Sequence, residues 1–308
     1  IGDITGDFIG NYASYYGGAI CNSVTIGDIT GDFIGNYASS SGNAYGGAIS
    51  NYKDAEINSL AGDFISNSAK GASNVQGGAI YNKDKIGDIT SNFTENIVTA
   101  NGAEANAHGG AIYNTGILGN IVGFFSKNKA DTTSSTNNGY ALGGAIYNKD
   151  NGQIGDITGD FSENKALAKT WADGGAIYNR NENLTLINSS FYNNYVSSTS
   201  GDKNNAKGGA IYNEIGDLNI IANDGKQSVF SGNKIIYDNN QESNAIYMES
   251  GLLNLSATEG GKIIFDDKIV ATKGSETGNV ADENSYIGES GYFTQDADGN
   301  IVFYNSKT

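Results

Sequence analysis

The feature that most constrains this chain is an internal repeat of two short motifs in alternating order. The first motif, Gly-Gly-Ala-Ile, begins at Gly17, Gly46, Gly77, Gly109, Gly143, Gly174 and Gly208, and a degenerate eighth copy begins at Ser243. The second motif, Phe-x-x-Asn, begins at Phe8, Phe33, Phe64, Phe93, Phe125, Phe161, Phe191 and Phe230. One unit is too short to bury a core alone, so the units must stack on one another.

The spacing between the motifs divides each unit into a constant half and a variable half. The Ile of the first motif precedes the next Phe by 13 to 15 residues in the first six intervals and by 19 in the last. The Asn of the second motif precedes the next Gly-Gly by anything from 6 to 15 residues. We interpret the constant half as the stacked framework and the variable half as loops that leave it at one edge.

The constant half has the alternation of a half-buried strand. Ile4, Gly6 and Phe8 point one way, and the polar residues between them point the other way. No segment keeps a helical period, and Gly-Gly pairs disfavour helices. The sequence therefore predicts a right-handed parallel β-helix of about eight coils over residues 1–250. Residues 251–308 keep strand-like segments with a different spacing, and we expect them to continue the solenoid and cap its C-terminal end.

The Asn of the second motif occupies the same position in every unit. In stacked coils, each of these side-chain amides can bond to the amide in the next coil. We therefore expect an internal ladder made of Asn36, Asn67, Asn96, Asn128, Asn164 and Asn194. The chain has no proline, so every backbone N–H group is free to pair between coils.

Composition excludes some classes of partner. The net charge is −16, so no basic stripe is available for nucleic acid, and an anionic membrane surface is disfavoured. Cys21 is the only cysteine, which rules out an intrachain disulfide. No segment has the length and apolarity of a membrane helix, and none looks like a signal peptide. Because Ile1 opens directly on a repeat, we expect the chain to be a piece of a longer protein.

Acidic residues recur at equivalent places of the constant half. Asp3, Asp28, Asp88 and Asp156 belong to one such row, and stacking would bring some of these carboxylates close together. Calcium prefers oxygen ligands, so a bridging Ca²⁺ ion is one interpretation. The favoured interpretation is a solvated acidic face, and no other cofactor is indicated.

Aromatic residues in the variable half are the candidate binding groups. Tyr15, Tyr16, Tyr45, Tyr140 and Trp171 all fall there. Exposed aromatic side chains often anchor glycans or proteins, although these rings could instead cover neighbouring loops.

Groups for catalysis are sparse in the sequence. Arg180 is the only arginine and His108 the only histidine, and each falls in a connection between expected strands. We interpret the Asp266-Asp267 pair as a solvated turn. No nucleophile with its base, and no pair of acids across a cleft, can be identified, so we do not expect an enzyme.

The two motifs resemble those of chlamydial polymorphic outer membrane proteins and related autotransporter passenger domains. The segment 174–179, Gly-Gly-Ala-Ile-Tyr-Asn, followed by Leu184, Phe191 and Asn194, is similar to that family's repeat. The resemblance covers roughly residues 1–250. It implies a right-handed β-helix, secretion across a Gram-negative outer membrane and a role in adhesion. The family's translocator barrel has no counterpart in this sequence, so membrane attachment is implied by the resemblance alone.

Three functional hypotheses follow. The leading one is a non-enzymatic, extracellular or outer-membrane surface protein that acts in adhesion or self-association. Its partners would be a host or bacterial surface glycan, a surface protein, or a second copy of the chain. The alternative is a subunit that stacks end to end into an extracellular filament. A polysaccharide lyase or hydrolase is a third hypothesis, supported by analogy of fold only.

Overall fold

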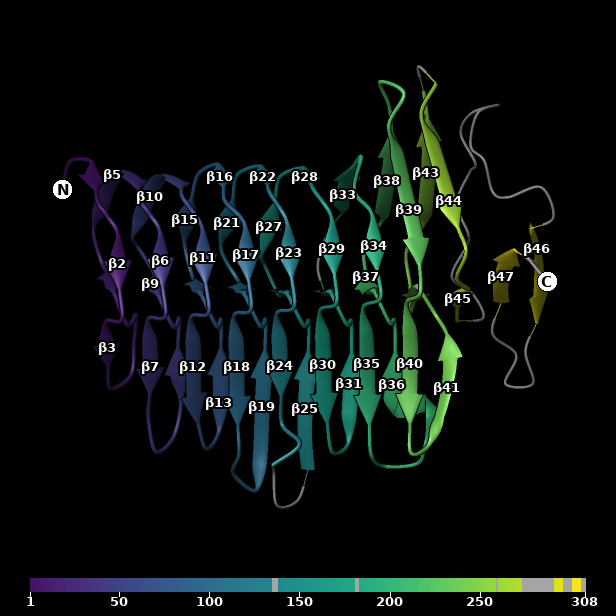
Figure 1. Cartoon of the computed structure of the whole chain (residues 1–308), viewed down its shortest axis with the longest axis horizontal. Coiled ribbons are helices and arrows are strands. Elements are labelled where there is room, and N and C mark those ends of the chain that lie inside the picture. Colours follow the sequence, from purple (N-terminus) through teal and green to yellow (C-terminus); the bar gives the residue numbers. More distant parts are fainter. Residues whose placement is uncertain (135–137, 181–182, 259, 273–290, 296–300, 306–308) are drawn as a thin grey trace.

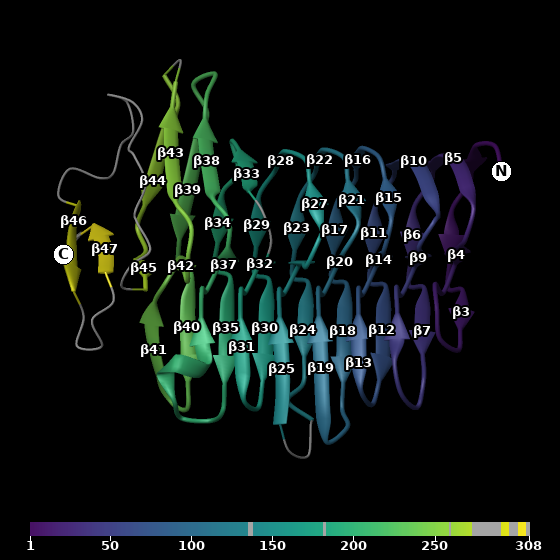
Figure 2. The same ribbon diagram turned by 180° about the vertical axis from the view of Figure 1, so that it is seen from behind.

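The protein is a right-handed parallel β-solenoid of about eight coils, which confirms the predicted fold class (Figures 1 and 2). The computed structural model describes residues 1–134, 138–180, 183–258, 260–272, 291–295 and 301–305. In these ranges the only helix is the short 3-10 helix η1 (Lys203–Asn205). None of the described residues forms a helix long and apolar enough to cross a membrane.

One coil is enough to describe the architecture, because the strands stack in register on the strands of the next coil. The coil that begins at the fourth Gly-Gly contains β20 (Ile112–Asn114), β21 (Ile117–Leu118), β22 (Ile121–Val122), β23 (Phe125–Ser126), β24 (Lys129–Asp131) and β25 (Asn138–Leu142). We name the stacked sheets by these strands. Sheet E contains β20, sheet A contains β21 and β22, sheet B contains β23, sheet C contains β24, and sheet D contains β25.

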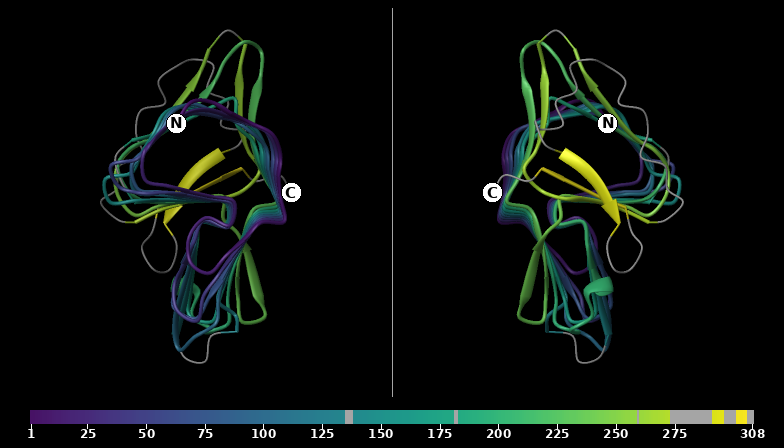
Figure 3. Two further views of the ribbon diagram at one scale, coloured as in Figure 1. Left: turned by 90° about the vertical axis from the view of Figure 1, so that its left-hand side faces the viewer. Right: turned by 90° about the vertical axis from the view of Figure 1, so that its right-hand side faces the viewer.

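Viewed along its axis, the solenoid has two lobes that meet at a narrow waist (Figure 3). Sheets E, A and B enclose the main core, where isoleucines and leucines pack beside a row of phenylalanines. Successive phenylalanine rings lie parallel, with centroids 4.5 to 4.9 Å apart. Sheets C and D enclose a second core made almost entirely of alanine and valine.

The second lobe shows that the loop assignment of the variable half was wrong. The variable half forms two sheets, and differences in its length are absorbed by the turns that join them. The segment Glu104–His108 is typical: Ala105 and Ala107 are fully buried, and the residues that alternate with them are more exposed. Alanine at every second position was the strand signal, but the surrounding Ser, Asn and Gly resembled loop composition.

The Gly-Gly pair lies at the waist, where the chain passes close to neighbouring backbone. The first glycine has a left-handed backbone, as in Gly77 with φ of 69°. At the second glycine no side chain fits, because a Cβ atom on Gly78 would lie 2.0 Å from the carbonyl oxygen of Gly110 and 2.7 Å from the amide nitrogen of Ile97. These two requirements explain the recurrence of the motif.

Two asparagine ladders run along the interior. The first contains the predicted residues: each Nδ2 donates to the Oδ1 of the next coil at 2.9 to 3.0 Å and also to a backbone carbonyl. This ladder starts at Asn11 and continues through Asn233 to Asp267. The second ladder, which the sequence analysis missed, joins Asn22, Asn51, Asn82, Asn114, Asn148, Asn179 and Asn213.

Near its C-terminal end the solenoid changes character. Two extended excursions project beyond the earlier coils, β38 (Leu218–Ala222) with β39 (Gln227–Ser231) and β43 (Leu253–Ala257) with β44 (Lys262–Phe265) (Figure 1). Sheet C ends at an antiparallel pair, β40 (Lys234–Tyr237) and β41 (Asn240–Ser243). Sheet E continues through β42 (Ile246–Met248) and β45 (Ile269–Ala271) and ends at antiparallel β47 (Ile301–Asn305) and β46 (Gly291–Gln295).

Candidate functional site

The acidic side chains along sheet A accept hydrogen bonds from backbone N–H groups of the next coil and do not converge on one point. The Oδ1 of Asp3 accepts the backbone N–H of Asp28 at 2.9 Å. The Oδ1 of Asp88 accepts the N–H of Asn120 at 2.8 Å, and Asn120 accepts the N–H of Asp156 at 3.0 Å. Among the described residues, no three His, Cys, Asp or Glu side chains are grouped so that they could hold a metal ion. The row thus links neighbouring coils at a solvated surface.

The candidate aromatic residues divide into two groups. Tyr16 stacks on Tyr45, with centroids 5.2 Å apart, and Tyr45 contacts Tyr81 at 4.8 Å. These rings begin a tyrosine stack, described below. Tyr140 in β25 stacks on Trp171 in β31 (Trp171–Asp173), with centroids 5.2 Å apart, on the outer face of sheet D. Trp171 is 37% exposed, and Tyr15 is exposed near the first coil.

The tyrosine stack fills the corner between sheets D and E. The Tyr that follows Gly-Gly-Ala-Ile points away from the main core and is still at least 92% buried in the six coils concerned. The stack comprises Tyr81, Tyr113, Tyr147, Tyr178, Tyr212 and Tyr247. Burial raises the pKa of Tyr147 and its neighbours in the stack, so their hydroxyl groups stay protonated.

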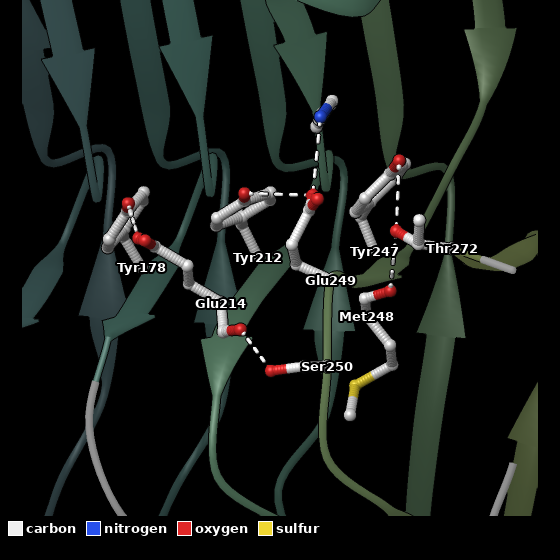
Figure 4. A network of polar contacts seen from close by, with 9 residues as sticks. Tyr178, Tyr212, Glu214, Tyr247, Met248, Glu249, Ser250 and Thr272 are labelled. Carbon is white, nitrogen blue, oxygen red and sulfur yellow. Dashed lines mark hydrogen bonds and ion pairs between the residues drawn. The ribbon is translucent and has the colours of Figure 1, made fainter. Parts of the chain in front are cut away.

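At the C-terminal part of this corner the hydroxyl groups bond to carboxylates (Figure 4). Tyr178 donates to Glu214, and Tyr212 donates to the Oε2 of Glu249 at 3.1 Å. The same Oε2 accepts Lys207 Nζ at 3.3 Å. Arg180 closes the network from the other side, with its Nε 3.2 Å from Glu214. Its role is therefore an ion pair at the end of a strand.

Two partly buried ionisable groups lie in this corner, His108 and Asp173, on the two strands of sheet D that flank β25. His108 stacks on Tyr147 with centroids 4.7 Å apart, and its Nδ1 has no hydrogen-bond partner. Burial lowers the pKa of His108 to about 3, and the charge of Lys149 adds to this. Burial raises the pKa of Asp173 to about 7, although Lys207 opposes the shift. The Nδ1 of His108 and the Oδ1 of Asp173 are both shielded from solvent, so we assign both side chains to the packing of this corner.

The Asp266-Asp267 pair was expected to be a solvated turn, and this was wrong for Asp267. Asp267 is buried and ends the first asparagine ladder: its Oδ2 accepts the backbone N–H and the Nδ2 of Asn233 at 2.7 and 2.8 Å. Its Oδ1 accepts bonds from Gly232 and Ser243. A carboxylate that accepts only is a suitable last rung.

On the opposite side of the waist, sheets B and C meet at a sharp turn in every coil (Figure 3). The residue before each Asn of the first ladder has a left-handed backbone. This conformation turns the Asn side chain inward and the side chain of the left-handed residue itself outward. These residues are Gly10, Gly35, Ser66, Glu95, Lys127, Glu163, Asn193 and Gly232. Left-handed backbone is strained for residues other than Gly, so the five non-glycine side chains are held there against a conformational cost.

These side chains form one wall of an axial groove. The other wall consists of outward residues of sheet C, among them Lys129, Lys165 and Tyr195. Hollows of about 410 and 340 Å³ share Glu163 and Lys165, and a third of about 390 Å³ adjoins them. We call this feature the waist groove; its lining is Ser66, Ser68, Glu95, Ile97, Lys127, Lys129, Glu163, Lys165, Asn193, Tyr195, Gly232 and Lys234.

The waist groove was missed in the sequence analysis, although its signal was present. The residue before the motif Asn changes from Gly to Glu or Lys in the middle coils. The chemistry of the groove is that of hydrogen bonding and charge: carboxylates accept hydroxyl or amino protons, and ammonium groups donate to carboxylates and hydroxyls. Comparison of the chain with protein family models, with curated proteins and with solved structures found no match in any of the three.

Proposed function

We propose that this chain is a non-enzymatic bacterial surface or secreted protein that adheres to extended glycans through the waist groove. The observation that carries the proposal is the run of Ser66, Glu95, Lys127, Glu163 and Asn193 at left-handed positions. Glycine would fit these positions without strain, as it does in the first two coils. A fold that keeps polar and charged side chains in a strained conformation indicates a use for those side chains.

The geometry of the groove suits a linear polymer laid along the solenoid axis. Its polar groups recur once per coil, about 4.8 Å apart, because parallel strands set the spacing. An extended pyranose chain presents hydroxyl groups at a similar interval. The stacked sheets hold the walls rigid, which reduces the entropy lost on binding.

The resemblance to autotransporter passengers supports a location at the bacterial outer surface. There the partner would be a host or bacterial glycan. The charge of −16 favours a glycan over nucleic acid as the extended polymer, because phosphate at every unit would be repelled at long range.

Glu163 and Lys165 together also favour a second candidate, polysaccharide cleavage, because a lyase uses a basic residue beside a carboxylate. A lysine acting as a base must lose its proton. Lys129 lies 3.0 Å from Asp131, and Lys165 lies 5.9 Å from the centre of the Tyr195 ring. Both contacts are those that a bound cation makes, with a carboxylate and with a ring face, so they support a binding role for these lysines.

The test uses the double variant Lys127→Gly and Glu163→Gly, which copies the first two coils and relieves strain. Binding of hexasaccharides of N-acetylglucosamine, which is neutral, and of galacturonic acid, which carries a carboxylate on every unit, is measured by calorimetry. We expect the neutral sugar to bind the more tightly, and its Kd to rise about tenfold or more in the variant. Lys85→Ala on sheet A is the control and should leave Kd unchanged.

Three results bear on the alternatives. Equal binding by the double variant and the parent chain, or no binding of either sugar, contradicts the proposal. Release of unsaturated or reducing-end products from the same sugars supports cleavage instead. Sedimentation at rising concentration measures self-association separately.

A further inference from the structure

The outer surface of the coil that contains β21 and β22 departs from its neighbours in three rows at once. Ile117, Val122 and Phe124 are 46%, 48% and 57% exposed. In register, Ile117 lies between Lys85 and Gln153, and Val122 lies between Thr90 and Thr158. The position of Phe124 is occupied by Asn92 and Asp160 in the adjacent coils. We call these three residues the apolar stripe.

Single exposed apolar residues are ordinary on protein surfaces, but here three of them lie on the same coil. All three outward rows are polar in both neighbouring coils and become apolar in one coil. The fold therefore accepts polar residues at these positions, and packing does not demand apolar ones.

Phe124 also gives up a bond that its row makes elsewhere. The side chains of Asp7, Asp32, Asp63, Asn92 and Asp160 each accept the backbone N–H of the equivalent residue in the next coil, at 2.8 to 3.1 Å. A phenylalanine has no acceptor for this bond. The fold loses an inter-coil hydrogen bond here and leaves a large ring in solvent.

Carboxylates lie on both sides of the apolar stripe. Asp88 and Asp156 lie in the coils on either side of Asn120, and each is hydrogen bonded to Asn120. Asp160 lies beside Phe124 in the next coil. Within the described part of the chain, no Lys or Arg forms an ion pair with these three carboxylates. Their charge is thus available to a partner.

We propose that the apolar stripe is a docking surface for a protein segment that carries apolar side chains flanked by Lys or Arg. Apolar residues would cover Phe124 and its neighbours, and cationic residues would meet Asp88, Asp156 and Asp160. An aromatic side chain at the centre of an interface is a common anchor, and complementary charge at its rim sets specificity and association rate. This surface is separate from the waist groove and does not depend on glycan binding.

The test compares the parent chain with the variant Ile117→Gln, Val122→Thr and Phe124→Asp. These substitutions copy the next coil, so the solenoid should form normally, as circular dichroism and the Tm will report. The probe is a short labelled peptide of alternating Lys and Leu, with binding measured by fluorescence anisotropy. We expect the Kd to rise about tenfold or more in the variant.

Two control peptides separate the contributions. A peptide of alternating Lys and Ser keeps the charge, and one of alternating Glu and Leu keeps the apolar residues; both should bind the parent chain weakly. If the triple variant fails to fold, Asp156→Asn with Asp160→Asn replaces it, since asparagine occupies these rows at Asn120 and Asn92. That variant should weaken binding and reduce its dependence on salt.

The proposal is overturned if the parent chain and the variant bind the Lys-Leu peptide equally. It is also overturned if the Lys-Ser peptide binds as tightly, because charge alone would then explain the affinity. Self-association of the parent chain that disappears in the variant would identify a second copy as the occupant, which contradicts a cationic segment.

Discussion

Replacing Asp173, whose Oδ1 is shielded from solvent, should make the protein more stable, and by an amount that depends on pH. Burial raises its pKa to about 7 in the folded chain, against about 3.9 in an unfolded chain. Lys207, Glu249 and Glu214 are the charged groups that act on it. Leu142 occupies the equivalent position on the adjacent strand, so Asp173→Leu fits the row.

The sign and size follow from linkage. A carboxyl with a raised folded pKa holds its proton more tightly in the folded state, so it lowers stability as pH rises from about 4 to about 7. The difference of about 3 between the folded and unfolded pKa values corresponds to a loss of about 4 kcal/mol of unfolding free energy above pH 7. Asp173→Leu should therefore gain about 4 kcal/mol at pH 8 and much less at pH 4.

His108 provides a matched control, because it lies in the same row on the other side of Leu142. Its pKa is lowered to about 3, so the folded protein loses stability as pH falls from about 6.5 towards 3. His108→Leu should gain about 3 kcal/mol at pH 4 and little at pH 8. Urea denaturation followed by circular dichroism measures both variants. A gain for Asp173→Leu that is the same at pH 4 and pH 8 would refute the reasoning.

Three further predictions concern the framework, and urea denaturation checks each. Asn128→Ala removes a rung that both donates and accepts between coils, and should cost about 3 kcal/mol or more because its buried partners are left unsatisfied; a loss below 1 kcal/mol would contradict a cooperative ladder. Gly144→Ala places a Cβ 2.0 Å from a carbonyl oxygen and should prevent folding, whereas Gly201→Ala, with open space around it and φ of 76°, should cost only about 1 kcal/mol. Phe125→Ala should cost about 4 kcal/mol, and Phe124→Ala next to it almost nothing, since only Phe125 lies in the core; similar losses would argue against the register.

The part of the fold that repeats could be predicted from the sequence, and the part that varies could not. Ile, Phe and the motif Asn recur with nearly constant spacing, and identical residues in stacked coils must meet, so the core and the first ladder follow from periodicity. The second ladder was equally periodic, as the Asn after Ala-Ile-Tyr, and was overlooked. The second lobe was missed because its strands use alanine, whose hydrophobic signal is weak.

The candidate sites consist of residues that depart from the repeat, and the sequence alone does not show which of these departures matter. Tyr16 and Tyr45 fall in the variable half, yet in the structure they are partly buried and extend the row of tyrosine rings beyond Tyr81. Glu163 and Phe124 gain meaning only when the neighbouring coils show what the position otherwise holds. Asp267 lies in the irregular end region, where no period indicated that it would complete a ladder.

The asparagine ladder also gives the solenoid an electrical direction. In the first ladder each side-chain amide turns its Oδ1 towards the N-terminal end and one N–H towards the C-terminal end, while its other N–H bonds a carbonyl of the preceding coil. The aligned N–H···Oδ1 dipoles add along the axis, as peptide dipoles do in an α-helix. The strand dipoles of a β-sheet contribute little along the solenoid axis. The positive pole of this array meets the carboxylate of Asp267, in the way that an acidic residue neutralises the start of a helix. A β-solenoid with such a ladder is a polarised rod, whose two ends differ in the charge they attract.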